Sequence, residues 1–272
     1  MKQVMWWAIF CVGLVIAAFG FAKYLERRAV YFPLAELPNT PADMGLAYEN
    51  VWVVSGQGYR IHGWFVPGEE ARCTVLLFHG NGGNIGHRIE KIAFLHSAGA
   101  NVYLIDYRGY GKSEGSPSEE GLYRDAFAAY RYLRETKHIP PERIILYGES
   151  LGGAVAVHTA VHRPVGGVIL EGTFSSGRDL AREYYPWLPS VFFSPLYDSM
   201  RKITRVDAPL LFLHSSEDEI IPYRCARRLF ARAGRPKRFV TLRGGHNMVT
   251  AVSAQEYRGA IENFLARFCA QD

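Results

Sequence analysis

Short apolar segments alternate with amphipathic segments along most of the chain. Near-continuous apolar runs bounded by turn residues predict strands over residues 74–78, 101–105, 143–147, 167–170, 210–214 and 238–242. Longer stretches with one apolar face predict helices over residues 85–98, 119–136, 151–162, 223–233 and 253–269. Buried strands that alternate with amphipathic helices are typical of a parallel sheet covered on both faces.

Two further strands precede this series. Residues 49–55 and 59–67 have strand-like patterns on either side of the Gly56-Gln57-Gly58 turn, which indicates an antiparallel pair. We therefore expect one α/β domain over residues 49–272, with an eight-stranded, mostly parallel sheet. The length of 272 residues suits one large domain, and a hydrophobic content of 49% is enough for its core.

The N-terminus has a different pattern. Residues 4–22 are 19 consecutive uncharged residues, with Trp6 and Trp7 at the start. As a helix they would span about 28 Å, close to the hydrocarbon thickness of a bilayer. The pattern predicts a single-pass membrane anchor over residues 1–28, followed by a Pro-rich linker over residues 29–48. The alternative is a cleaved signal peptide, for which Gly20-Phe21-Ala22 is a poor cleavage site.

The charges give little information about orientation or partners. Lys23, Arg27 and Arg28 follow the apolar run and Lys2 precedes it, which leans slightly towards a cytoplasmic domain but leaves the side of the membrane undetermined. The net charge of +5 is spread along the chain without a nucleic-acid-binding motif. It is compatible with an anionic membrane surface, and no nucleic-acid partner is expected.

The cysteines do not suggest a disulfide framework. Cys11 lies in the apolar run, which leaves Cys73, Cys225 and Cys269, an odd number without metal-ligand spacing. We expect these three to be small buried hydrophobic residues.

Residues 174–207 interrupt the alternation of strands and helices because they are aromatic and repeatedly broken by proline. One interpretation is an irregular helix packed on the sheet. The other is a small lid that lines an apolar substrate pocket. The candidate pocket residues are Tyr184, Tyr185, Trp187, Phe192 and Phe193.

The strongest chemical signal is the pentapeptide Gly148-Glu149-Ser150-Leu151-Gly152. It matches G-x-S-x-G, a sharp strand-to-helix turn that exposes a nucleophilic serine above an α/β sheet. A strand is predicted before it and a helix rich in small residues after it. The serine needs strained backbone angles, and a Cβ on the flanking glycines would collide with neighbouring backbone. Ser150 is therefore the candidate nucleophile.

A serine nucleophile needs a base and an acid that orients the base. Asp218 and His246 follow predicted strands in the order Ser, Asp, His that α/β-hydrolases use. The alternatives for the acid are Glu217, Glu219 and Glu171. His158 and His162 have the i, i+4 spacing of metal ligands but lack the Glu of a zinc-protease helix, so no metal is expected.

The tetrahedral intermediate needs two donors for its oxyanion. The backbone N–H of Leu151 directly follows the nucleophile. The second candidate is the N–H of Asn81, in the loop His79-Gly80-Asn81-Gly82-Gly83-Asn84 after the strand 74–78. This glycine-rich loop lacks the phosphate-binding patterns, and no cofactor is expected.

Three blocks of sequence resemble the Bem46-type α/β-hydrolases, which include membrane-anchored serine hydrolases and are related to protein depalmitoylases. The blocks are His79-Gly80-Asn81-Gly82-Gly83-Asn84-Ile85-Gly86-His87-Arg88, Asp106-Tyr107-Arg108-Gly109-Tyr110-Gly111-Lys112-Ser113 and Gly148-Glu149-Ser150-Leu151-Gly152-Gly153. The resemblance implies a hydrolase with Ser150, Asp218 and His246 as its triad. It also implies a structural role for Asp106, which together with Arg108 would hold its loop.

The sequence therefore predicts an α/β-hydrolase fold with a small lid, anchored in a membrane. The expected reaction is hydrolysis of carboxylic esters or thioesters, with an acyl ester, a lipid or a lipidated protein as substrate. One alternative is a peptidase of the same fold. The other is a non-catalytic scaffold at a membrane, although such proteins usually lose a triad residue.

Overall fold

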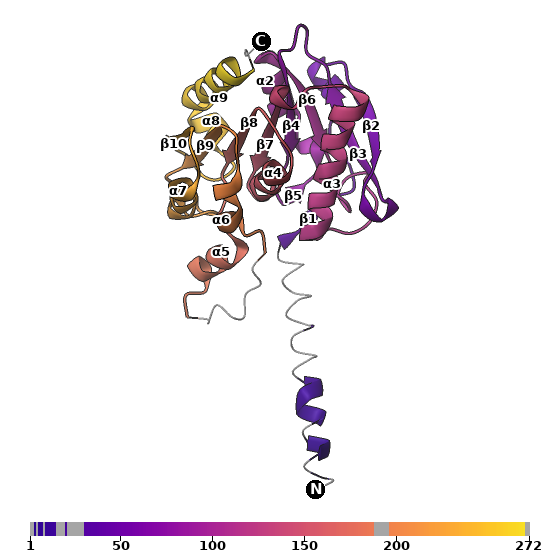
Figure 1. Cartoon of the computed structure of the whole chain (residues 1–272), viewed down its shortest axis with the longest axis vertical. Coiled ribbons are helices and arrows are strands. Elements are labelled where there is room, and N and C mark those ends of the chain that lie inside the picture. The colour runs from indigo at the N-terminus through magenta and orange to yellow at the C-terminus, as the bar shows by residue number, and fades with distance from the viewer. Residues whose placement is uncertain are drawn as a thin grey trace.

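The computed structural model describes residues 3, 5–7, 9–14, 20, 30–187 and 196–269. An eight-stranded sheet in the order β10-β9-β8-β7-β4-β6-β3-β2 forms the centre of the domain (Figure 1). Its strands are β2 (Glu49–Val54), β3 (Arg60–Val66), β4 (Cys73–Phe78), β6 (Ala100–Ile105), β7 (Ile144–Glu149), β8 (Gly167–Glu171), β9 (Leu210–Ser215) and β10 (Lys237–Leu242). This confirms the predicted fold and all eight predicted strands.

The direction of the strands also agrees with the prediction. β2 pairs with β3, and β3 with β6, in antiparallel fashion, whereas all other neighbours are parallel. Every residue of the central strand β4 is buried. Leu76 and Phe78 face one core, and Val75 and Leu77 face the other, as the alternation of side chains across a strand requires.

Helices cover both faces of the sheet. The helices α3 (Glu119–Arg131), α4 (Leu151–His162) and α7 (Tyr223–Arg232) contribute to one core, and α2 (Ile89–Ser97) and α9 (Ala254–Phe268) to the other. The predicted helix 85–98 begins as a 3₁₀ turn (Ile85–Arg88), and the predicted helix 119–136 ends as a π-helical turn (Tyr132–Thr136). Three short helices lie outside the predicted helix ranges: α5 (Gly177–Tyr184), α6 (Ser199–Lys202) and α8 (Val249–Val252). The first two fall in residues 174–207, for which an irregular helix was one interpretation.

The expectation about the cysteines was wrong. Cys73, at the start of β4, and Cys269, just after α9, form a disulfide with their Cα atoms 5.3 Å apart. The two residues are 196 positions apart in sequence, and only the packing of α9 on the sheet brings them together. Cys225 is a buried free thiol, as predicted.

The segment expected to be a linker packs against the domain. Its β1 (Phe32–Pro33) pairs in parallel with β5 (Gly82–Gly83), in the glycine-rich loop. The buried Asn84 side chain donates hydrogen bonds to the Leu34 carbonyl at 2.9 Å and the Glu36 carbonyl at 2.5 Å. Residues 31–39, here called the strap, therefore form part of the folded domain.

Within the described residues, no helix has the length and apolar character needed to cross a bilayer. Most of the predicted anchor, and the candidate pocket residues Phe192 and Phe193, lie outside the described residues.

Candidate active site

Ser150 occupies the turn between β7 and α4 with a strained backbone. Its φ of 51° and ψ of −113° lie outside the regions that side-chain-bearing residues normally adopt. Surrounding hydrogen bonds hold this conformation: the Ser150 N–H donates to the Glu171 carbonyl at 2.8 Å, and the Thr173 hydroxyl donates to the Ser150 carbonyl at 3.1 Å.

The glycines of the turn are sterically required. A Cβ on Gly152 would lie 2.0 Å from the Phe78 carbonyl oxygen, and one on Gly148 would lie 2.4 Å from the Gly152 carbonyl oxygen. Both contacts involve backbone, which cannot move aside cheaply. The sharp turn predicted from G-x-S-x-G is therefore present, with the predicted steric cause.

Asp218 and His246 meet through a direct hydrogen bond. The imidazole Nδ1 lies 2.7 Å from Asp218 Oδ2, and the aspartate side chain is only 1% exposed. The backbone N–H groups of Ile220 and Ile221 donate to the other carboxylate oxygen at 2.9 and 2.7 Å. These bonds fix the carboxylate and direct it towards the imidazole.

The rival carboxylates have other partners. Glu217 accepts from the Gly244 N–H at 2.9 Å, and Glu219 accepts from the His246 N–H at 3.0 Å. Both therefore hold the backbone of the histidine loop. Glu171 accepts from Lys91 at 2.6 Å instead of contacting the imidazole.

Asp218 and His246 each stabilise the charged form of the other. Burial alone would raise the pKa of Asp218, but its hydrogen bond with His246 and the charge of the imidazolium hold that pKa below its ordinary value. Burial alone would lower the pKa of His246, but the hydrogen bond and the negative charge of Asp218 raise it above 6.5. This arrangement stabilises an imidazolium formed beside Asp218.

Gly172 borders the histidine and directly follows the residue that accepts from the backbone of Ser150. A Cβ on Gly172 would lie 3.0 Å from His246 Cε1, and the preceding residue, Glu171, accepts the hydrogen bond from the Ser150 N–H. Ser150, Asp218 and His246 follow β7, β9 and β10, so all three lie at the carboxyl ends of parallel strands. This is where open α/β sheets place their ligand sites.

Both candidate oxyanion donors border Ser150. Leu151 begins α4, so its N–H has no acceptor within that helix. Asn81 follows Gly80, where a Cβ would lie 3.5 Å from the Ser150 Cβ. The Asn81 carbonyl accepts from the Phe32 N–H at 3.0 Å and from the Tyr110 hydroxyl at 2.8 Å, which fixes the orientation of this peptide segment.

The expected association of Asp106 with Arg108 was wrong. Asp106 accepts from the Ile85 N–H at 3.0 Å and lies 3.6 Å from His79 Nε2. Burial raises the pKa of Asp106 to about 7 and lowers the pKa of His79 to about 3. Arg108 instead forms a buried ion pair with Asp125 at 2.8 Å, because its side chain extends towards α3 and away from the glycine-rich loop.

A buried charge cluster lies beside the nucleophile. Lys91 Nζ lies 2.8 Å from Glu149 and 2.6 Å from Glu171, and Arg88 lies 3.2 Å from Glu149. Burial alone would lower the pKa of Lys91, but the two carboxylates raise it well above its usual value. The cluster is electrically balanced and fixes the ends of β7 and β8.

Sequence reasoning missed Lys91 as a member of this cluster, although a signal was present. Glu149 and Glu171 end adjacent strands at matching positions in the register. Two carboxylates buried side by side require a cation, and α2, which packs on that face, provides one.

A cavity of about 490 Å³ adjoins His246 on the side of the charge cluster. Its lining mixes charged residues such as Arg88, Lys91 and Glu149 with apolar ones such as Phe94 and Val249. Tyr184, Tyr185 and Trp187 are not among its lining residues in the described part of the chain; they are exposed by 50%, 51% and 75%. Their role as pocket residues stays a prediction.

His158 and His162 pack against aromatic rings. The His158 ring stacks on Tyr123 with the ring centroids 3.6 Å apart, and it lies 4.5 Å from the His162 ring. In the part of the chain that the structure describes, no group of three or more His, Cys, Asp or Glu side chains is arranged to hold a metal ion.

Several known proteins are similar to this chain in sequence or in fold. Residues 69–197 match a family profile described as serine aminopeptidase, S33. WAV2 of Arabidopsis thaliana, an α/β hydrolase domain-containing protein, is 34% identical over 90% of this chain and 88% of its own length. Protein bem46 of Schizosaccharomyces pombe is 34% identical over 84% and 81%, and YfhR of Salmonella typhi, described as uncharacterized, is 32% identical over 95% and 94%.

Among solved structures, an esterase from Pyrococcus furiosus superposes with a TM-score of 0.74 over 89% of this chain and 98% of its own, at 20% identity. At that identity the likeness concerns the fold. Together with the full-length relatives, it shows that this chain belongs to the Bem46, YfhR and WAV2 family of α/β hydrolases.

Proposed function

We propose that this protein is a membrane-anchored serine hydrolase that cleaves carboxylic esters or thioesters of an acyl substrate. The observation that carries the proposal is the 2.7 Å bond between Asp218 and His246, held beside a serine in a strained turn. The esterase among the structural neighbours supports the same reaction class.

In the proposed mechanism, the Ser150 hydroxyl oxygen attacks the acyl carbon while His246 takes its proton. Asp218 stabilises the resulting imidazolium, and the N–H groups of Asn81 and Leu151 bind the oxyanion. The imidazolium then protonates the departing alcohol or thiol, which leaves an acyl-enzyme. Water, deprotonated by His246, attacks the acyl carbon, and the acid is released as Ser150 regains its proton.

The proposed anchor rests on the 19 uncharged residues at 4–22. The disulfide between Cys73 and Cys269 favours a domain on the oxidising side of the membrane, because disulfides are rare in reducing compartments. The disulfide outweighs the slight positive-inside lean from Lys23, Arg27 and Arg28, since that lean depends on a small difference in charge.

A second candidate is aminopeptidase activity, which the match to the serine aminopeptidase profile favours. The acidic residues next to the cavity, Glu149 and Glu171, could attract a substrate amine. Both are already neutralised by Lys91 and Arg88, which argues against this candidate. Parallel assays of aminoacyl anilides and acyl esters of matched size distinguish the two activities.

The test of the proposed function is a comparison of wild type with Ser150→Ala. We expect wild type to react with a fluorophosphonate probe and to hydrolyse p-nitrophenyl esters. The variant should lose the adduct and about 10⁶-fold in kcat, since a missing nucleophile leaves only binding and oxyanion effects. A folded wild-type protein that forms no adduct would indicate a non-catalytic scaffold. Unchanged esterase activity in Ser150→Ala would contradict the assignment of the nucleophile.

A further inference from the structure

Exposed apolar side chains lie on the strap, on and after α5, and in the loops that carry Asp218 and His246. Together they define what we call the strand-end face. These side chains are Phe32, Leu34, Tyr184, Trp187, Ile220 and Met248, exposed by 53%, 52%, 50%, 75%, 41% and 54%. Exposed apolar side chains that gather in one place, unlike scattered ones, mark an interaction surface.

Hydrogen bonds connect this face to the catalytic residues. The Phe32 N–H donates to the Asn81 carbonyl at 3.0 Å, and the Ile220 N–H donates to Asp218 at 2.9 Å. The Tyr184 hydroxyl donates to the Ile220 carbonyl at 2.6 Å, which joins the end of α5 to the Asp218 loop. These bonds connect the strap and the end of α5 to the segments that carry Asn81 and Asp218.

The strand-end face also lies where the N-terminal segment leaves the domain. Figure 1 places β1, β5 and α5 at the end of the domain nearest the described N-terminal residues. The strap begins at Tyr31, only nine residues after the apolar run 4–22. An anchor inserted in a bilayer would hold this face close to the lipid headgroups, because nine extended residues reach about 30 Å at most.

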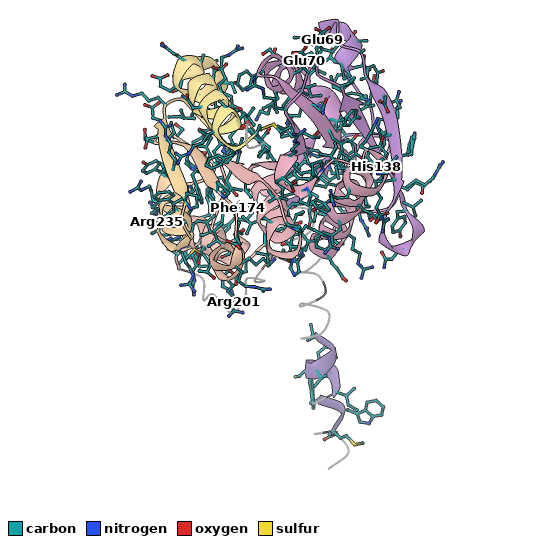
Figure 2. The ribbon with its side chains drawn as sticks, turned by 45° about the horizontal axis from the view of Figure 1, so that its top comes forward. Glu69, Glu70, His138, Phe174, Arg201 and Arg235 are labelled. Carbon is teal, nitrogen blue, oxygen red and sulfur yellow. A yellow bond between two sulfur atoms is a disulfide. The ribbon has the colours of Figure 1, made fainter. Side chains whose placement is uncertain are left out.

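Two exposed arginines lie on helices at the same end of the domain as the N-terminal segment (Figure 1). Arg182 and Arg201 are 53% and 86% exposed on α5 and α6, and they lie 3.8 Å from Asp179 and 3.3 Å from Asp198. Figure 2 shows Arg201 at the end of the domain towards the N-terminal residues, and Glu69 and Glu70 at the opposite end. Exposed arginines near the anchor are suited to the field of an anionic bilayer.

From these observations we propose that the strand-end face docks on an anionic bilayer and that the site takes its ester from the lipid interface. Trp187 and Tyr184 are residue types that favour the headgroup region. The substrate class is then an amphiphilic ester whose acyl carbonyl lies at headgroup depth. This inference rests on the membrane anchor of the proposed function and specifies where its substrate comes from.

The first test measures depth in the membrane with the full chain in nanodiscs of phosphatidylglycerol and brominated phosphatidylcholine. All variants in this test carry Trp6→Phe and Trp7→Phe, which remove the two tryptophans of the predicted anchor. Bromine should quench Trp187, so adding Trp187→Phe should remove most of the quenching. Adding Trp52→Phe, which removes an exposed tryptophan on the edge strand β2, should not. Equal quenching in the Trp187→Phe and Trp52→Phe variants would overturn the docking. In that case the strand-end face is covered by another part of the chain or is open to water.

The second test measures hydrolysis with the charge reversals Arg182→Glu and Arg201→Glu combined. We expect kcat/KM for a long-chain ester in phosphatidylglycerol vesicles to fall roughly tenfold, while p-nitrophenyl butyrate is hydrolysed at the wild-type rate. Each single reversal is compared with the control Arg72→Glu, which reverses an exposed arginine in the loop of Glu69 and Glu70. An equal loss with Arg72→Glu, or no loss with the pair, would overturn the inference.

The outcomes separate the inference from the function on which it rests. Quenching of Trp6 and Trp7 in wild type tests the anchor, and hydrolysis of the soluble ester tests the hydrolase. If Trp6 and Trp7 are quenched and the soluble ester is hydrolysed, but Trp187 is not quenched, the protein is an anchored hydrolase whose strand-end face does not touch lipid.

Discussion

At the scale of single residues, the site depends on buried groups whose charges are matched. Asp218 is fixed by two backbone N–H groups and directed towards His246, and Glu217 and Glu219 fix the backbone of the histidine loop. Carboxylates that are neighbours in sequence thus have different functions because each has different donors. Their order in the sequence carries no information about these donors.

Replacing Asp218 with asparagine should lower kcat by about 10⁴-fold, because the amide cannot hold the productive imidazole tautomer or stabilise the imidazolium. Asp218 raises the pKa of His246, and the base must be neutral to accept a proton. In wild type the rate should therefore rise with pH through a pKa above 6.5. In Asp218→Asn this rise should shift to lower pH. A pH–rate profile of kcat/KM measures both effects, and an unchanged profile would show that Asp218 is not the partner.

At the scale of elements, the strap and the glycine-rich loop support each other. Asn84 connects them: its side chain donates to two strap carbonyls and accepts from the Gly86 N–H at 3.0 Å. The strap in turn holds the Asn81 carbonyl through the Phe32 N–H. A segment whose composition indicates a linker thus positions one of the candidate oxyanion donors.

Asn84→Ala should lower kcat by about 10²-fold with a smaller change in KM, since a displaced donor weakens binding of the transition state more than binding of the substrate. The matched control is Asn101→Ala. Asn101 holds a loop at the amino ends of the strands through bonds to Gly68 and Thr74. Steady-state kinetics on a soluble ester, with thermal melts of both variants, test this. A similar fall in kcat for both would indicate a general loss of packing.

At the scale of the whole molecule, the disulfide connects the start of the central strand to the end of the last helix. Its position at the amino ends of the strands keeps it away from the candidate catalytic residues at the carboxyl ends. A cross-link over 196 residues restricts the unfolded chain over most of the domain. The expected effect is therefore on stability and not on chemistry.

Cys269→Ser should lower the free energy of unfolding by about 2–5 kcal/mol, the usual range for a native disulfide, and leave kcat unchanged. Cys73→Ser should have the same effect, and the double variant should cost little more, because either change removes the same bond. Denaturant titrations measure these values.

In protein extracted from cells with acid quenching and then denatured, only two of the four cysteines should react with an alkylating agent. Four reactive cysteines would contradict the oxidising compartment.

The sequence by itself determined the strands, the nucleophile turn and the order of the candidate triad. These features depend on local patterns: apolar periodicity defines each strand, and glycines at fixed offsets from Ser150 allow the turn. Parallel strands bring their carboxyl ends to one edge, so Asp218 and His246 could be placed there without knowledge of any contact.

Only the tertiary structure decided the disulfide, the partner of Arg108, the position of the strap and the cation beside Glu149. Each depends on a contact between segments that are distant in sequence. Lys91 and Glu149 are 58 residues apart, and Cys73 and Cys269 are 196 apart. Such pairs are selected by the packing of helices on the sheet, where burial requires every charge to find a partner. Local patterns report which residues are buried, but not which side chains they meet.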